Sequence, residues 1–180
     1  RQDIKNPAAA VQWLRRAAEA GHTESMYQLF VRLKYGSEVV NDAAAADRWL
    51  RRAAEAGHTE AGYNLGLQFL HGGYGVAKDP AAAVQWLRRA AEAGDVSAMV
   101  DLGNCLLQRF GSTGVAEDPA AAVQWLRRAA EAGDVRAMGD LGSCLQRGIG
   151  VAKDPATAVL WFKRAKEASA VSRAHRGEPD

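Results

Sequence analysis

The 180-residue chain has the composition of an ordinary folded protein, with 48% hydrophobic and 24% charged residues. Its formal net charge is only +2, so no strong overall field draws it to nucleic acid or anionic lipid. No apolar run approaches the ~20 residues of a membrane span, and no secretory leader opens the chain. These features exclude a mostly disordered chain and direct membrane insertion. Because the chain begins at Arg1 rather than at methionine, we expect a processed form or a fragment of a larger protein.

Five tryptophans recur at spacings of 36, 37, 39 and 36 residues, a period that indicates a helical repeat solenoid: Trp13, Trp49, Trp86, Trp125 and Trp161. Four of them lie in nearly identical segments, residues 10–21, 46–57, 83–94 and 122–133. We call each predicted helix a B helix. Aspartates are expected to cap its start and glycines in the left-handed conformation its end. The apolar residues fall on one stripe, so the tryptophans are expected to be buried.

A second helical pattern lies between successive B helices and defines the A helices. Its clearest form is Ala98, Leu102, Gly103 and Leu106, and residues 61–69 and 137–145 repeat it. Glycine inside a helix costs about 1 kcal/mol relative to alanine, so its return at one position predicts a close helix crossing. Phe30 replaces this glycine in the first repeat, and there we expect a splayed helix pair or an aromatic ring turned outward.

The elements in chain order predict an all-α, right-handed superhelix of nine helices, beginning with a B helix near Pro7 and ending with one from Pro155. Ser169 stands where the other B helices have their cap glycine, so the last helix is expected to run on through Ala174 and cover the open apolar end. We therefore assign residues 1–168 to the solenoid and residues 169–180 to a C-terminal helical extension and tail.

The loops from A to B carry the pattern G-V-x-x-D, as in Gly150, Val151 and Asp154. Together with the A-x3-L-G and W-x-x-A-A-E-x-G segments, this resembles the Sel1-like repeats of the tetratricopeptide-like superfamily. The resemblance covers nearly the whole chain, with departures that include a longer loop at residues 111–113. It implies an adaptor in protein complexes, as in membrane-protein quality control and bacterial signalling.

No convergent set of catalytic or metal-binding residues is visible. His22, His58, His71 and His175 form no cluster with metal-ligand spacing, and no G-x-S-x-G segment is present. Cys105 and Cys144 occupy equivalent places in two repeats, too far apart for a disulfide, so we expect two free thiols, which favour a reducing compartment. We predict no cofactor, no metal and no enzymatic activity, with His22 and His58 as exposed helix-start residues.

Paired basic residues recur on the B helices, as in Arg88 and Arg89 or Arg127 and Arg128. A glutamate follows the first member of each pair by four residues and is expected to neutralise it. No aromatic side chain is expected to interleave this ladder as a base-stacking platform would require. The pattern is typical of a solvated convex face, and we predict no nucleic-acid partner.

The outward positions of the A helices differ from repeat to repeat, and A helices line the concave side of such solenoids. We therefore predict a partner-binding groove that is apolar and aromatic early and polar and acidic late, although surface drift would produce variation too. Its residues are Tyr27, Gln28, Val31, Tyr35, Tyr63, Asn64, Leu67, His71, Val100, Asp101, Asn104, Gln108, Asp140, Ser143 and Arg147.

The leading prediction is a monomeric protein–protein interaction scaffold that binds a peptide or partner protein in this groove. A first alternative is a noncatalytic regulatory module of a larger enzyme or membrane-anchored protein. A β-lactam hydrolase is a further alternative, because some Sel1-like proteins with paired cysteines have affinity for penicillin-like compounds. Each repeat here has at most one cysteine, so that property is not carried over. The near-identical B helices also leave open an engineered array with no natural partner.

Overall fold

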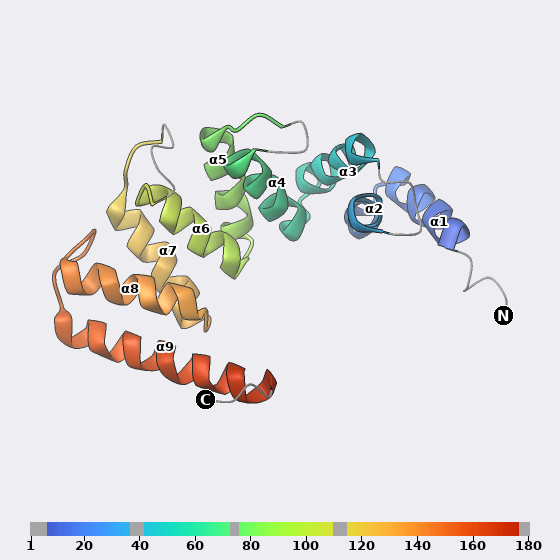
Figure 1. Ribbon diagram of the computed structural model, residues 1–180. Coiled ribbons are helices and arrows are strands. Elements are labelled where there is room, and N and C mark those ends of the chain that lie inside the picture. The colour runs from blue at the N-terminus through green and yellow to red at the C-terminus, as the bar shows by residue number, and fades with distance from the viewer. Residues whose placement is uncertain (1–6, 37–41, 73–75, 110–114, 177–180) are drawn as a thin grey trace. The chain divides into compact units, whose positions relative to one another are not determined.

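The computed structural model describes residues 7–36, 42–72, 76–109 and 115–176, and within them the chain forms nine helices (Figure 1). These are α1 (Pro7–Glu19), α2 (Thr23–Tyr35), α3 (Ala43–Glu55), α4 (Thr59–His71), α5 (Pro80–Glu92), α6 (Val96–Leu106), α7 (Pro119–Glu131), α8 (Val135–Arg147) and α9 (Pro155–Arg176). The predicted alternation is confirmed, with the B helices at odd and the A helices at even numbers. The predicted loop glycines Gly75 and Gly114 and the inserted residues 111–113 lie outside the described residues.

The chain divides into two compact units, Arg1–Ala93 with α1 to α5 and Gly94–Asp180 with α6 to α9. Within the first unit, α1 packs on α2, α2 on α3, α3 on α4 and α4 on α5. Within the second, α6 packs on α7, α7 on α8 and α8 on α9. Within each unit, successive helices therefore pack against one another, which is the packing rule of a repeat solenoid.

Each B helix from α3 onward begins at an aspartate that caps its first turn. The carboxylates of Asp42, Asp79, Asp118 and Asp154 accept hydrogen bonds from backbone N–H groups three residues on, at 2.9, 3.0, 2.9 and 3.0 Å. The backbone N–H of Asp79 also donates to the carbonyl oxygen of Phe69 at 2.8 Å, and that of Asp154 to Leu145 at 2.8 Å. The expected aspartate caps are thus confirmed, and Asp79 and Asp154 also join the end of an A helix to the start of the next B helix.

The predicted close crossings are present at the A-helix glycines. A Cβ atom added to Gly66 would lie 3.0 Å from Leu87 Cγ, and one added to Gly103 would lie 2.9 Å from Leu126 Cγ. At Gly142 the nearest atom would be Phe162 Cε1 at 2.7 Å. Each of these glycines therefore lets the following B helix press a leucine or phenylalanine against the A-helix backbone.

Phe30, which replaces this glycine in the first repeat, is 1% exposed. Its ring lies 5.7 Å from that of Tyr27 and 6.3 Å from that of Tyr35, centroid to centroid. The expectation of an outward-turned aromatic ring is therefore wrong. Burial of a large ring among other rings is favourable enough to keep it in the core.

The tryptophans were all predicted to be buried, but their exposed fractions differ along the chain. Trp161 is 8% exposed, and Trp49 and Trp86 are partly buried against the core, but Trp13 is 67% exposed. In the later repeats the B helix packs on the A helix that precedes it, and the described residues contain no A helix before α1. The prediction for Trp13 is wrong because its side chain has no such neighbour.

The last helix passes through Ser169 without a break, as expected, and ends at Arg176. It does not cover the apolar end of the second unit, however. Val159 is 64% exposed and Leu160 60%, while Val171 in the extension is 56% exposed. The expectation of a covering role is wrong, because the extension continues the axis of α9 and does not turn back over it (Figure 1).

The two cysteines are free and buried, Cys105 at 1% exposure and Cys144 at 0%. Burial, with a smaller contribution from the Asp101 charge, raises the pKa of the Cys105 thiol to about 12, and burial also raises the pKa of Cys144. Because the thiolate is the reactive form, both groups are expected to be inert in the folded chain.

Native protein should therefore react with a thiol reagent such as 5,5′-dithiobis(2-nitrobenzoic acid) far more slowly than unfolded protein, in which two thiols should react at once. The absorbance of the released thionitrobenzoate measures both rates. Fast labelling of two thiols under native conditions would contradict the burial of these side chains.

Two glycines of α4 provide a matched test of the close crossing. Gly66→Ala should destabilise the fold by about 1–3 kcal/mol, because overpacking against Leu87 outweighs the gain in helix propensity. Gly62→Ala should instead stabilise it by up to about 1 kcal/mol, because its Cβ would meet only Ala90 Cβ at 3.9 Å. Urea unfolding followed by circular dichroism measures both changes, and equal effects would contradict the crossing.

Candidate functional site

The A helices of the first unit begin at histidines where those of the second begin at aspartates. His22 Nδ1 accepts a hydrogen bond from Ser25 N at 3.2 Å, and His58 Nδ1 accepts one from Ala61 N at 3.3 Å. Asp95 and Asp134 hold the same place in α6 and α8. His22 is exposed as expected, but the His58 side chain is only 12% exposed, so the prediction of an exposed helix-start residue is wrong for His58.

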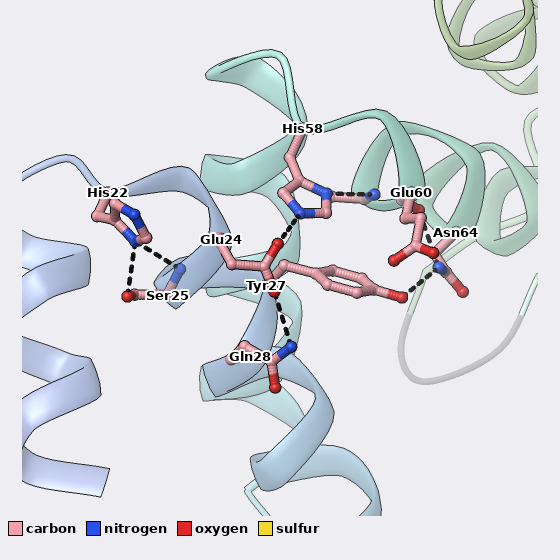
Figure 2. A network of polar contacts seen from close by, with 9 residues as sticks. His22, Glu24, Ser25, Tyr27, Gln28, His58, Glu60 and Asn64 are labelled. Carbon is pink, nitrogen blue, oxygen red and sulfur yellow. Dashed lines mark hydrogen bonds and ion pairs between the residues drawn. The ribbon is translucent and has the colours of Figure 1, made fainter. Parts of the chain in front are cut away.

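His58 belongs to a polar network that joins α2 to α4 (Figure 2). Since Nδ1 accepts the capping bond, Nε2 carries the proton and donates to Glu24 Oε2 at 3.0 Å. Gln28 Nε2 donates to the other oxygen of Glu24 at 2.7 Å. Two predicted groove residues, Tyr27 and Asn64, complete the network: the Tyr27 ring stacks on His58 at 4.5 Å, and Asn64 Nδ2 donates to the Tyr27 hydroxyl at 3.2 Å.

The network fixes the charge of its members. Hydrogen bonds from Gln28 and His58 lower the pKa of Glu24, which favours the carboxylate. Burial and then the nearby Glu60 charge raise the pKa of Tyr27, which keeps the phenol protonated. The surface shared by α2 and α4 therefore carries the Glu24 carboxylate, held by two hydrogen bonds, and the neutral phenol of Tyr27.

Beside this network, residues of α2 and α4 line a hollow of about 230 Å³ that is open to solvent. Its lining residues are Lys34, Tyr35, Asn64, Leu67, Gln68, His71 and Gly72. Four predicted groove residues thus come together: Tyr35, Asn64, Leu67 and His71. Tyr35 is 66% exposed, and Lys34 Nζ lies 4.9 Å from the centroid of its ring. Of the other predicted residues in this unit, Gln28, Val31 and Tyr63 are half-buried outside the hollow.

Several predicted groove residues of the second unit already have partners within the chain. Asp140 forms an ion pair with Arg109, whose guanidinium also donates to Asn104 Oδ1 at 3.3 Å. The Ser143 hydroxyl donates to the carbonyl oxygen of Gly139 at 2.9 Å. Asp101 is half-buried and Arg147 is exposed at the end of α8. The late acidic character expected of the groove is thus reduced at Asp140 by Arg109.

Two residues of the predicted groove are placed differently from the expectation. Val100 is 1% exposed and offers no surface to a partner, because seven of the eleven residues of α6 are buried. Gln108 lies beyond the end of α6 with a φ of 53°, and its side chain donates to Val115 O at 3.3 Å. Helical periodicity therefore does not place Gln108 on the outer face.

The basic ladder of the B helices also differs from the expectation. One guanidinium in each B helix lies over the tryptophan three residues before it, as Arg52 does over Trp49 at 4.6 Å and Arg128 over Trp125 at 4.6 Å. Aromatic rings thus do lie along the ladder, but from α3 onward each tryptophan is buried or half-buried beneath its own guanidinium. Of the expected pairs with glutamate, Lys163 and Glu167 come within 3.9 Å in the described part of the chain, whereas Arg51 pairs with Asp47 at 2.7 Å.

Three lining residues of the hollow were not predicted, namely Lys34, Gln68 and Gly72. Gln68 occupies the place of the buried Cys105 and Cys144 in the later repeats, so a polar residue at an apolar position was the available signal. Across the described residues, no group of three or more His, Cys, Asp or Glu side chains could hold a metal ion. None of the helices described is long and apolar enough to cross a membrane.

Helix pairs with capped junctions, repeated glycine crossings and an all-helical content define an α-solenoid repeat protein. The family model for the Sel1 repeat matches residues 3–22, 23–58, 59–95, 96–134 and 135–169. The chain belongs to the Sel1 repeat family. Proteins of this family generally act as protein-interaction scaffolds and are generally non-catalytic.

Solved structures support the same assignment. A Sel1 repeat protein from Oxalobacter formigenes shares 34% identity with a TM-score of 0.80, over 91% of this chain and 66% of that one. The protective antigen c5321 of uropathogenic Escherichia coli, which displays an SLR fold, shares 33% identity with a TM-score of 0.79, over 93% of this chain and 37% of that one. MamA, at 19% identity and a TM-score of 0.55, shows likeness of fold alone. No curated protein sequence matches the chain significantly.

The Glu24 carboxylate allows a test of the polar network through pH. Because its pKa is below the ordinary 4.5, it contributes stability above that pH, and the contribution is lost as pH falls through its lowered pKa. Glu24→Gln should therefore cost about 0.2–1 kcal/mol at pH 7, and the difference from the wild type should vanish in acid. Urea unfolding at several pH values measures it.

Glu92→Gln, on an exposed glutamate with no ion pair within the described residues, is the matched control and should change stability little at any pH. A Glu24→Gln effect that stays constant from neutral pH to pH 3 would contradict the role of the carboxylate charge.

Proposed function

We propose that the chain is a noncatalytic scaffold that binds a peptide segment or partner protein on the A-helix surface. The observation that carries the proposal is the convergence of Tyr35, Asn64, Leu67 and His71, from two A helices, on one hollow. These positions vary between repeats, whereas the B helices hardly change. A surface that varies while its support stays constant is what a recognition scaffold requires.

The physical properties of this surface suit recognition. An exposed tyrosine ring beside a small hollow is the kind of anchor that dominates protein interfaces. The network of Glu24, Tyr27, His58 and Asn64 holds α2 against α4, so little conformational entropy has to be lost when a partner binds. Pre-organisation of this kind raises affinity without any additional contact.

A second candidate function is a regulatory or recognition module within a longer protein. The chain spans 66% and 37% of the lengths of its two most identical structural relatives described above, so proteins with this fold carry further segments. Catalysis through a cysteine nucleophile is not favoured, because both thiols are buried and their raised pKa values keep them protonated.

The proposal is tested by selecting binders from a phage-displayed library of random peptides on the full chain. Against a selected peptide, Tyr35→Ala should weaken binding by about 1–3 kcal/mol, and His71→Ala should weaken it by a smaller amount. Isothermal titration calorimetry measures the affinities. Thermal unfolding should be nearly unchanged, because both side chains are exposed.

Trp13→Ala is the matched control, because Trp13 is an aromatic residue of the same exposure on a B helix, 67% against 66% for Tyr35. It should leave binding unchanged. If binding instead survives Tyr35→Ala and is lost in the double variant Arg88→Ala, Arg127→Ala, the B-helix surface is the binding surface and the proposal is wrong.

A further inference from the structure

Gly62 in α4 stands where each of the other three A helices has a methionine. Met26, Met99 and Met138 occupy the fourth position of their repeats, and Gly62 occupies that position in its own repeat. The three methionines are 5%, 5% and 8% exposed, so this position normally fills core space with a long apolar side chain. In α4 that side chain is missing.

A hollow lies in the direction in which the missing side chain would extend. A Cβ atom added to Gly62 would meet Ala90 Cβ of α5 at 3.9 Å and nothing nearer. Both residues line a hollow of about 220 Å³ at the start of α4. Because Cα–Cβ bonds tilt toward the N-terminus of a helix, a long side chain at position 62 would extend toward His58 and Thr59, which line the same hollow. The hollow therefore coincides with the place of the absent methionine.

The walls of this hollow are mostly apolar, and its imidazole already has partners. Ala90 is buried and the ring of Trp86 is half-buried. His58 Nδ1 accepts the N–H of Ala61, and its Nε2 donates to Glu24 (Figure 2). A side chain that enters the hollow would therefore gain from apolar burial and would find no imidazole nitrogen free to bond.

The charges at the hollow favour a neutral ligand group. Glu55 and Arg89 are its exposed charged residues, and their opposite charges balance. The Arg89 guanidinium lies 4.9 Å from the centroid of the Trp86 ring, so a lysine or arginine tip would meet a cation there. A charged tip of either sign would also lose hydration among apolar walls. A methionine side chain is neutral and unbranched, fills irregular spaces, and its sulfur interacts favourably with aromatic rings.

The methionine has to come from outside these 180 residues. The sequence contains three methionines, and all three are the buried residues at the equivalent positions. A second copy of the chain would therefore have none to offer. We propose that the hollow beside Gly62 binds a methionine side chain of a partner protein. This site goes beyond the proposed function, because it shares no lining residue with the hollow that contains Tyr35.

The fit of the side chain is tested by supplying it from the chain itself. Gly62→Met should raise the melting temperature by about 4–8 °C, because it adds apolar burial to a gain in helix propensity. Gly62→Gln, of the same length and similar helix propensity, should raise it less, because a carboxamide gains little among apolar walls. Thermal unfolding followed by circular dichroism measures both. A methionine variant no more stable than the glutamine variant would overturn the proposal.

Binding is tested with peptides selected on the full chain from a random phage-displayed library that has first been depleted on Gly62→Met. The remaining binders should be enriched in methionine. In a selected peptide, replacement of the methionine by alanine should weaken binding at least about tenfold, because the apolar burial is lost. Replacement by lysine should weaken it at least as much. Isothermal titration calorimetry measures the affinities.

Gly139→Met is the matched control, because a Cβ atom added to Gly139 would meet nothing within 4 Å. This variant should bind the selected peptides as the wild type does. Binders without methionine enrichment would overturn the inference. Equal affinity for the wild type and Gly62→Met would overturn it too.

The two proposed sites are separated by Tyr35→Ala, which should leave the affinity of these peptides unchanged. If Tyr35→Ala releases them and Gly62→Met does not, this inference is wrong and the proposed function stands. If Tyr35→Ala has no effect on peptides selected without depletion, while the methionine peptides need Gly62, the proposed function is wrong and this inference stands.

Discussion

The close contact between an A-helix glycine and the large apolar side chain of the next B helix is the constraint on which the rest of the structure depends. It occurs at Gly66 with Leu87 in the first unit and at Gly103 with Leu126 and Gly142 with Phe162 in the second. Without a Cβ atom the two helix backbones approach closely, and the side chain of the B helix fills the remaining space. The aspartate caps add a second link between the same helices, because the backbone N–H groups of Asp79, Asp118 and Asp154 also bind carbonyl oxygens near the end of the A helix.

This packing also determines which side of an A helix is left for recognition. One face of α4 is occupied by the contact with α5, and its start is fastened to α2 through His58 and Glu24. The side chains that remain accessible, among them Asn64 and His71, therefore lie beside those of α2 on a supported surface. Gln68 differs from its neighbours here, because its buried Oε1 atom has no hydrogen-bond partner.

Repeat periodicity predicted the helices, their caps and their glycine crossings, because these are local features that each repeat contains in full. It could not predict burial, which depends on neighbours. The helices α1, α5 and α7 share one 13-residue sequence, yet Trp13 is exposed while its equivalents Trp86 and Trp125 are half-buried. Likewise, four groove residues converged as their helical positions suggest, whereas Val100 is buried together with most of the residues of α6.

Gln68 could likewise be predicted only in part. Its position in the repeat predicts that the side chain is buried, but it does not predict that the Oε1 atom has no hydrogen-bond donor.

The histidine caps differ from the aspartate caps in what the capping residue can do besides capping. In α6 and α8 a carboxylate oxygen of Asp95 or Asp134 accepts the first-turn N–H, and a carboxylate has no N–H of its own to donate. In α4 the imidazole Nδ1 of His58 accepts the N–H of Ala61, which leaves the opposite ring nitrogen to donate to Glu24 of α2. One histidine thus both starts a helix and links it to its neighbour, in the unit that bears the hollow.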